Sequence, residues 1–347
     1  MWNAGLAELT EVARREPSAS RASELLPDGA AVRDVARLEH ALRAACKAAP
    51  AGLSGAALQL VRAGGKRVRP MLVLLAARSA DGRGHPGRAR LAVAAELVHT
   101  ASLLHDDVVD DGLTRRGLPA PRVIYGNAVA VLSGDWLLAT ALELAFRSRV
   151  AGAPEALSRA IRGVVEGEAA QLALRGRLAF TPDDALRVAR LKTGALFGFC
   201  AEAGALSAGA PRAVTSALRE FGERAGTAFQ AADDLLDFEG DPRTLGKAVL
   251  ADVVEGKPSL PVALALLGRP LLRQELTALA RLGTAAAHPE RLRQLAEKLR
   301  ASGALEKARA VAQREHAAAL AALARVPDSP SRRLLEAVTG ALMTRST

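Results

Sequence analysis

Two clusters of aspartates are the groups in this chain whose type and spacing could do chemistry. Both read DDxxD and follow apolar helical patterns: Asp106, Asp107 and Asp110 in "LLHDDVVDDG", and Asp233, Asp234 and Asp237 in "AADDLLDFEGD". Carboxylates this close repel one another, and a helix C-terminus is the unfavourable end of the macrodipole for them. Such oxygen ligands suit Mg²⁺, which takes one or two carboxylates and completes its shell with water and substrate phosphates. A solvated helix end could explain one cluster, but two matched copies favour cation binding.

The spacing within the first cluster predicts which carboxylates share a helix face. If the helix continues through the cluster, Asp106 and Asp110 form an i,i+4 pair, and Asp107 and Asp111 form a second pair on the adjoining strip. His99 lies seven residues before Asp106 and on the same face. A lone histidine is usually a satisfied core residue, but one on a metal-facing strip can meet a phosphate.

A metal–phosphate site also needs cationic and polar side chains, and several stand beside glycines or near the acids. They are Lys66, Arg67 and Arg69 in "AGGKRVRP", Arg115 and Arg116 in "LTRRG", Lys192 and Thr193 in "LKTGALF", Gln230 in "AFQAADD", Lys247 in "LGK" and Lys257 in "EGKPSLP". Taken singly, such segments are more often surface turns or basic patches. Their number and their proximity to the acids favour a phosphate site.

The elements that must position these residues are predicted to be helices. Half of the 347 residues are hydrophobic and only 3% are aromatic, so the core is mostly Ala, Leu and Val. Strong helix formers dominate, which favours an all-α protein. Helical patterns lie at 31–48, 52–63, 67–79, 88–111, 121–148, 154–176, 182–207, 211–238, 251–267, 271–282, 289–301, 304–325 and 331–343.

Domain organisation follows from the breaks between these patterns. Residues 1–30 look loosely organised, and the breaks after them are short and contain no interdomain linker. No fixed-period repeat occurs. We therefore expect a single large helical domain over 31–347.

Composition also bounds the class of protein. Cys46 and Cys200 have no CxxC or histidine-rich spacing, so they are expected to be buried thiols of a cytoplasmic protein. No uninterrupted apolar run reaches about 18 residues, so no membrane span is expected. The net charge of +10 comes from Lys and Arg scattered among acids, which indicates a solvated surface and no nucleic-acid partner.

Taken together, these segments resemble the trans-isoprenyl diphosphate synthases, the polyprenyl synthetase family. The ordered series runs from about residue 64 to 261 and comprises "GGKRVRP", "ELVHTASLLHDDVVDDGLTRRG", "YGNAVAVLSGDWLL", "EGEAAQL", "KTGALF", "GTAFQAADDLLDFEGD" and "LGKAVLADVVEGKPSLP". The sequences of these motifs are most similar to those of bacterial long-chain, octaprenyl-type enzymes. The resemblance implies an all-α bundle around a deep central cavity, with the two aspartate clusters facing each other at its mouth.

The same resemblance implies a prenyltransferase and its mechanism. Three Mg²⁺ ions per site are expected, with Asp106, Asp110 and Asp233 bridging them to an allylic diphosphate as Lewis acids. The C–O bond then breaks to an allylic cation, the double bond of isopentenyl diphosphate attacks it, and a proton is lost. No covalent enzyme intermediate is needed, so the chain requires no nucleophile–base pair.

Carried over residue by residue, the resemblance assigns further roles. The positions that match those holding isopentenyl diphosphate are Lys66, Arg69, His99 and Arg116. The positions around the allylic diphosphate are Arg115, Lys192, Thr193, Gln230, Lys247 and Lys257. Asp107, Asp234, Asp237 and Lys192 join the three metal-bridging aspartates in the catalytic set. One local departure is "GLPAPRVIYGN", whose Arg122 and Ile124 are bulkier than expected beside the mouth.

Product length is predicted from the wall below the first cluster. In the resembling family, bulky residues five and four positions before the first aspartate close the pocket, whereas here these are Ala101 and Ser102. Each open helical turn adds about 5 Å of depth. We expect a long all-trans product of about C35 to C45, with a C20 geranylgeranyl product as the alternative and Leu142 as a candidate floor.

Three other interpretations explain fewer of these residues. A terpene cyclase would not need the isopentenyl set or a second DDxxD, and a non-catalytic subunit of a heteromeric synthase would be expected to lack an aspartate cluster. A basic nucleic-acid-binding protein leaves both clusters unexplained. The resemblance further implies a homodimer without a membrane span, whose product passes to membrane enzymes.

Overall fold

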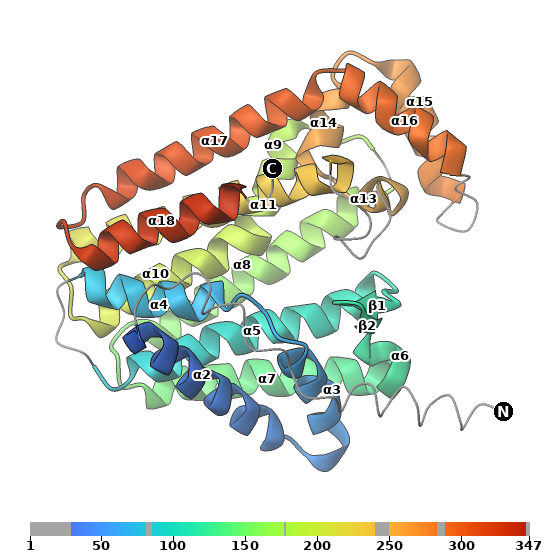
Figure 1. Ribbon diagram of the computed structural model, residues 1–347. Helices are drawn as coiled ribbons and strands as arrows, with labels where there is room; N and C mark the ends of the chain where they lie inside the picture. The colour runs from blue at the N-terminus through green and yellow to red at the C-terminus, as the bar shows by residue number, and fades with distance from the viewer. Residues whose placement is uncertain (1–28, 81–84, 177, 240–249, 283–288, 345–347) are drawn as a thin grey trace. The chain divides into compact units, whose positions relative to one another are not determined.

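The computed structural model describes residues 29–80, 85–176, 178–239, 250–282 and 289–344. These are almost entirely helical, with one short antiparallel hairpin among them, so the predicted all-α class is confirmed (Figure 1). The chain divides into two compact units. Unit 1 is Met1–Ser158 with Cys200–Pro211, and unit 2 is Arg159–Phe199 with Arg212–Thr347. The single domain over 31–347 and its central cavity remain predictions, and so does the loose segment 1–30, since residues 1–28 lie outside the described ranges.

Unit 1 is built around a helix whose central residues 91–98 are all buried and which ends in the first acidic cluster. Its elements are α2 (Gly29–Lys47), α3 (Ala51–Arg62), α4 (Val68–Ser79), α5 (Arg88–Val109), β1 (Thr114–Arg115), β2 (Leu118–Pro119), α6 (Pro121–Tyr125), α7 (Asn127–Arg147), the start of α8 (Ala153–Leu174) and the end of α10 (Ala195–Ser207). Helix α5 packs along α7 and α4. Small side chains such as Ala94, Ala95 and Ala101 are fully buried on it, which lets neighbouring backbones approach closely.

Helix α7 differs from α5 because much of it is exposed. By length and composition it is the one described helix that could cross a membrane, yet only a third of its most apolar window is buried. Its buried side, which includes Leu137 and Ala141, covers α5. Its exposed side carries both apolar residues and carboxylates, and this surface is considered below.

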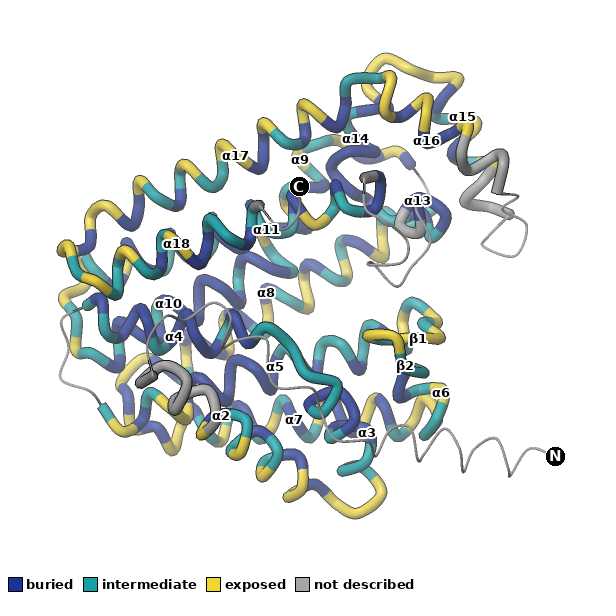
Figure 2. Tube along the Cα trace, in the orientation of Figure 1, coloured by how far each residue is buried: buried dark blue, intermediate teal, exposed yellow. Residues whose placement is uncertain are grey.

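Unit 2 is organised by a long helix paired with a C-terminal one. Its elements are the rest of α8, α9 (Pro182–Ala189), the π-helix η2 (Arg190–Gly194), the start of α10, α11 (Arg212–Glu239), α13 (Ala251–Val254), α14 (Leu260–Leu266), α15 (Pro270–Leu282), α16 (Pro289–Ala301), α17 (Ala304–Leu323) and α18 (Pro330–Thr344). Helix α17 runs along α11 (Figure 1). Its exposed positions recur about once per turn in Figure 2, as expected for an amphipathic helix with one face in a core.

Most predicted helices are present, and the differences have local causes. The stretch 121–148 is split at Gly126, whose φ of 85° is left-handed. The stretch 88–111 ends at Val109, and 182–207 contains the π-helix. Both thiols are free and fully buried as expected, and burial raises the pKa of Cys46 to about 12.

Candidate active site

The first acidic cluster lies where α5 ends, within a Schellman turn. Gly112 N–H donates to Asp107 O at 2.9 Å and Asp111 N–H donates to Val108 O at 3.4 Å. Asp110 is the C-cap residue, and its N–H still bonds Asp106 O at 2.8 Å, so these two stay one turn apart. Asp111 has a left-handed φ of 53°. The predicted helical pair of Asp107 with Asp111 is therefore wrong, because the chain leaves the helix between them.

Asp107 is a buried anchor in this structure. It is fully buried, and its Oδ1 accepts a 2.8 Å hydrogen bond from Arg115 Nε. Its Oδ2 is buried and has no hydrogen-bond partner among the described residues. Burial raises the pKa of Asp107 although Arg115 opposes the rise. Asp107 thus holds Arg115 in place, while Asp106 and Asp110 are partly exposed.

Arg115 and Arg116 lie on the β1–β2 hairpin. Arg116 (φ 55°) and Gly117 (φ 75°) form its tip, both left-handed as in a type I′ turn. Arg116 Nη1 donates to Leu60 O at 3.1 Å and also to Gly64 O. The bond to Gly64 ties the hairpin to the glycine loop that carries Lys66. In the same loop, a Cβ on Gly65 would lie 3.4 Å from Arg116 Nη2.

A buried ion-pair network fixes that glycine loop. Arg67, which is 2% exposed and left-handed at φ 48°, is bonded to Glu39 at 2.6 Å and to Glu96 at 2.7 Å. Burial opposes the charge of Arg67, but the two glutamates raise its pKa overall. Glu39 and Glu96 were missed in the sequence, because nothing in their spacing links them to the loop.

His99, Arg69 and Arg116 come together near this network, as predicted. The pKa of His99 is held well below its usual range, chiefly by burial and then by Arg69, Arg116, Arg67 and Arg115. Burial also lowers the pKa values of Arg69 and Arg116, while Glu96 opposes both shifts. A neutral imidazole beside several guanidinium groups is suited to bind a polyanion.

The second acidic cluster, in unit 2, is joined to Thr193 by a chain of hydrogen bonds. Thr193 Oγ1 donates to Gln230 Oε1 at 2.8 Å, and Gln230 Nε2 donates to Asp234 Oδ1 at 3.0 Å. Asp234 Oδ2 accepts from Leu260 N–H at 3.1 Å. Three of the predicted site residues are thus brought together. Asp233 is exposed on the same helix, α11.

The remaining predicted site residues of unit 2 differ in burial and in their bonding partners. Lys192 pairs with Glu168 on α8, and Gln171 donates to the same carboxylate at 3.0 Å. Asp237 is fully buried, and Lys257 pairs with Glu255 at 2.6 Å. Lys247 lies outside the described residues. The paired Glu168 and Gln171 belong to "EGEAAQL", a segment that gave no individual site residues in the sequence.

The π-helix η2 carries Lys192 and Thr193, and two glycines allow its close packing. A Cβ on Gly194 would lie 2.8 Å from Glu223 O on α11, and a Cβ on Gly167 would lie 2.6 Å from Lys192 N. Single π turns in helices are frequent at functional sites. The π geometry cannot be read from the periodicity, which predicted an unbroken helix.

The residues predicted to set the product length lie on two helices of unit 1, α5 and α7. Ala101 is fully buried on α5, and Ser102 Oγ donates to His99 O at 2.8 Å. Leu142 is partly exposed on α7. The role of Leu142 as a cavity floor stays a prediction.

The donor set of the acidic clusters fits a hard divalent cation. The described residues contain no group of three His, Cys, Asp or Glu side chains in ligating geometry. Mg²⁺ needs only one or two carboxylates when phosphate oxygens and water complete its shell. Asp106 and Asp110, one turn apart and partly exposed, meet that need.

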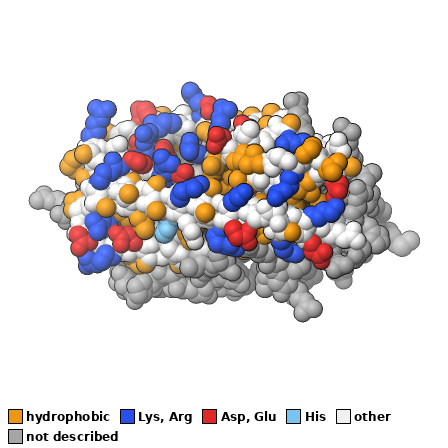
Figure 3. Space-filling view, turned by 90° about the horizontal axis from the view of Figure 1, so that it is seen from above, with side chains coloured by type: hydrophobic (Ala, Val, Ile, Leu, Met, Phe, Trp, Pro, Cys, Tyr) orange, Lys and Arg blue, Asp and Glu red, His pale blue; other side chains and the backbone are white. Residues whose placement is uncertain are grey.

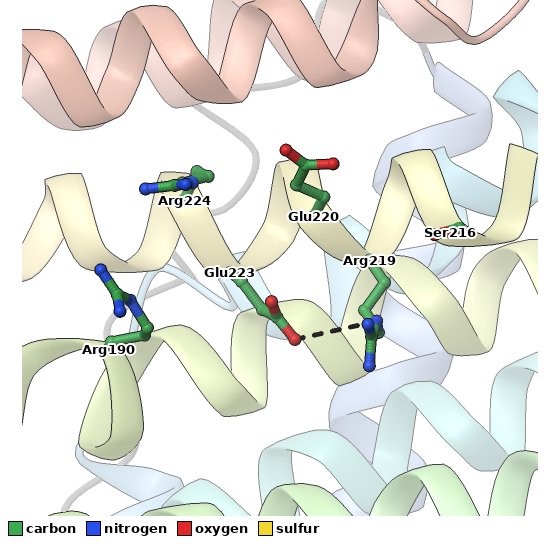
Figure 4. Close-up of a pocket in the computed structure, with 6 residues that line it drawn as sticks. All are labelled: Arg190, Ser216, Arg219, Glu220, Glu223 and Arg224. Atoms are coloured by element: carbon green, nitrogen blue, oxygen red, sulfur yellow. Dashed lines mark ion pairs between the residues drawn. The ribbon is translucent and has the colours of Figure 1, made fainter. Parts of the chain in front are cut away.

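Surface charge and pockets elsewhere do not compete with this site. A pocket of about 330 Å³ on unit 2, drawn in Figure 4, is lined by arginines and glutamates of α11 and by Arg190. Its charges are largely paired: Arg219 with Glu223 at 3.8 Å, and Arg224 with Glu315 at 2.9 Å. On the face shown in Figure 3, basic side chains are interspersed with acidic and hydrophobic ones.

Among the described residues, fold and site together define an all-α protein in which arginines and a histidine of depressed pKa gather near a turn rich in carboxylates. The chain belongs to the polyprenyl synthetase family, whose model matches residues 50–299. It is a prenyltransferase of the trans-prenyl diphosphate synthase type. The predicted family is thereby confirmed.

Individual relatives are similar over most of the chain. Octaprenyl diphosphate synthase of Escherichia coli (strain K12) is 38% identical over 279 residues, which cover 80% of this chain and 84% of that protein. Geranylfarnesyl diphosphate synthase of Aeropyrum pernix is 37% identical over 309 residues, covering 86% and 96%. A crystal structure of polyprenyl synthase from Caulobacter crescentus CB15, complexed with calcium and isoprenyl diphosphate, has a TM-score of 0.85 at 37% identity, covering 96% of this chain and 100% of that one. The names of matching proteins range from farnesyl to decaprenyl diphosphate synthase, and one is a component of a heptaprenyl synthase.

Proposed function

We propose that the chain condenses isopentenyl diphosphate with an allylic diphosphate and makes a long all-trans polyprenyl diphosphate of about C35 to C45. The observation that carries the proposal is the cluster of His99, Arg69 and Arg116 beside the acidic turn. Burial and mutual repulsion make such a set unfavourable alone. A bound diphosphate, with several negative charges, would offset both the burial of these side chains and their mutual repulsion.

The residues divide into two substrate sets. Lys66, Arg69, His99 and Arg116 hold isopentenyl diphosphate. Arg115, Lys192, Thr193, Gln230 and, with a supporting role, Lys247 and Lys257 hold the allylic diphosphate. Cations fixed around the leaving group stabilise the charge that develops when its C–O bond breaks. The electron pair leaves with the diphosphate, the isopentenyl double bond attacks the allylic carbon, and a proton is lost to the departing diphosphate.

Mg²⁺ is the proposed cofactor, with three ions held by Asp106, Asp110 and Asp233, and it supplies Lewis acidity to the leaving diphosphate when bound. The calcium in the Caulobacter crescentus structure supports a divalent-cation site in the family. Among the clustered carboxylates, Asp107 and Asp234 orient Arg115 and Gln230 through the hydrogen bonds described above. Asp237, the last member of the second cluster, is fully buried.

A homodimer with a cytoplasmic location is the proposed assembly. The exposed face of α7 carries Leu132, which is 54% exposed, Ala139 and Phe146, which is 68% exposed. Their spacing of seven residues places them on one stripe. Asp135 and Glu143 lie along the same stripe and are about half exposed. Carboxylates in its middle favour a second protein copy over lipid as the occupant.

One experiment tests both activity and product length. Purified protein, Mg²⁺, labelled isopentenyl diphosphate and a panel of allylic primers should give long products, and excess chelator should abolish them. Ala101→Phe should shorten the product, because the fully buried Ala101 would be replaced by a bulky wall residue. Leu142→Ala should lengthen it. An unchanged product distribution in Ala101→Phe would show that the helix wall at this position does not limit product length. A main product of C20 would favour the geranylgeranyl alternative.

A further inference from the structure

The turn that ends α5 has an unusual residue at its critical position. In a Schellman turn the residue after the C-cap is left-handed and is most often glycine, because a side chain disfavours that conformation. Here this residue is Asp111, with a φ of 53°, followed by Gly112. The last turn of α5 also contains no basic residue, although Asp106 and Asp107 lie in it and Asp110 and Asp111 follow directly. The turn therefore needs stabilisation from outside the helix.

Arg122 on α6 supplies three contacts to this region. Its Nη2 donates to Asp111 Oδ1 at 2.7 Å, its Nη1 donates to Gly112 O at 3.4 Å, and its Nε donates to Asn127 Oδ1 at 3.1 Å. The Arg122 side chain is only 16% exposed, whereas Asp111 is 83% exposed. A largely buried guanidinium thus reaches out to fix an exposed carboxylate.

The positions of the partners explain what this contact organises. Asp111 and Gly112 leave α5, Asn127 is the first residue of α7, and the hairpin with Arg115 and Arg116 lies between them. Arg122 therefore joins the two ends of the segment that carries the hairpin. Its positive charge also lies beside the C-terminus of α5, where a cation is favourable.

We propose that Arg122 is a positioning residue: it locks Asp111 in the left-handed turn and so holds Asp110 and the arginine hairpin in their binding geometry. In this role Arg122 acts through Asp111 and Gly112 rather than by binding substrate or metal. The structural part of this proposal stands on the contacts alone, and its consequence for catalysis rests on the proposed function.

The structural part is tested without metal or substrate. Arg122→Ala should speed amide hydrogen exchange in the segment 107–117 of the metal-free protein about fivefold, the upper range for losing an exposed ion pair. In an Asp111→Gly background, Arg122→Ala should change exchange by less than about twofold, because glycine adopts the left-handed turn unaided. Arg333→Ala, which removes the 2.6 Å surface pair with Asp328 on the other unit, is the matched control and should leave this segment unchanged.

The catalytic part is tested with the same variants. Arg122→Ala should raise the Mg²⁺ concentration for half-maximal activity about fivefold with kcat at saturation within about twofold, and Asp111→Gly should cancel most of this change. Arg122→Gln gives the same test if the alanine variant folds poorly. Equal increases in exchange in both backgrounds, or none in either, would overturn the proposal. An inactive wild-type protein would instead refute the proposed function and leave the exchange result intact.

Discussion

The two acidic clusters share the spacing DDxxD, but they are built into their helices differently. Helix α5 ends inside its cluster, with Asp110 at the cap and Asp111 left-handed. Helix α11 continues to Glu239, two residues beyond Asp237. The first cluster is therefore held by a turn and a hairpin that follow it, whereas the second is held by the regular geometry of a long helix.

Within each cluster, however, neighbouring aspartates share the same division of roles. The first members, Asp106 and Asp233, are accessible to solvent. The second members bond to the protein: Asp107 to Arg115, and Asp234 to Gln230 and the Leu260 N–H. In each adjacent pair the first carboxylate is thus the more accessible to solvent, and the second orients a neighbouring side chain.

The largest expected effect concerns the accessible members. Asp106→Ala and Asp233→Ala should each lower the turnover rate by at least about a hundredfold, the scale of losing one preorganised electrostatic contact. Steady-state kinetics at saturating Mg²⁺ measures this, and both variants should unfold at nearly the wild-type denaturant concentration. Asp328→Ala, at an exposed surface pair, is the control. Full activity in either Asp106→Ala or Asp233→Ala would contradict the prediction that the first aspartates of the two clusters have equivalent roles.

The second members should show their effect in stability. Asp107→Asn should cost about 2 kcal/mol of unfolding free energy, because it leaves Arg115 without its buried counter-charge. Asp234→Asn should cost about 1 kcal/mol, the scale of weakening its hydrogen bonds with Gln230 Nε2 and the Leu260 N–H. Denaturant titration measures both. A larger loss for Asp234→Asn would reverse the predicted ranking of the two anchors.

The two substrate sets should separate in the Michaelis constants. Arg116→Ala should raise KM for isopentenyl diphosphate about tenfold, the scale of one charge-assisted contact, and change KM for the allylic primer less. Lys192→Ala should act on the allylic KM or on kcat. The paired measurement with both substrates varied decides this, and an allylic-only effect of Arg116→Ala would show that its assignment is wrong.

The smallest expected effect is the pH dependence of unfolding free energy that comes from His99 in unit 1. Because the pKa of His99 is depressed, the folded state resists protonation, while the unfolded histidine binds a proton below about pH 6.5. Stability from neutral His99 is therefore present above pH 6.5 and is lost as pH falls, by about 0.8 kcal/mol at pH 6. Unfolding titrations of His99→Gln should lack this loss. His316→Gln is the comparison variant in unit 2, where burial also lowers the histidine pKa.

Much of the site follows from the sequence because its residues lie in short segments with regular spacing. Helical periodicity placed His99 and Asp106 on α5, and Thr193 proved to be bonded to Gln230, 37 positions away, which the resemblance to the family had grouped. Helix types and approximate ends were predictable for the same reason, since apolar spacing reports which face is buried.

The rest depends on contacts that spacing does not encode. Arg67 bonds Glu39 and Glu96, 28 and 29 positions away in opposite directions, and only tertiary packing brings them together. The left-handed Asp111 was missed because the turn favours glycine there and the sequence has aspartate. Arg122, noted in the sequence only for its bulk, proves to bond that residue.

The π-helix η2 has a consequence for how this protein can change in evolution. A π turn holds one residue more than an α turn, so a one-residue deletion within Arg190–Gly194 could leave α9 and α10 joined as a continuous α-helix. Because the wide turn absorbs the extra residue locally, such a deletion would leave the faces of α9 and α10 nearly unchanged and would shift the residues within the turn, which include Lys192 and Thr193. Lys192 and Thr193 could not then keep both of their present partners, Glu168 and Gln230. The backbone could thus accept the loss of one residue, but the contacts of Lys192 and Thr193 could not. Selection for activity should therefore keep the extra residue in place.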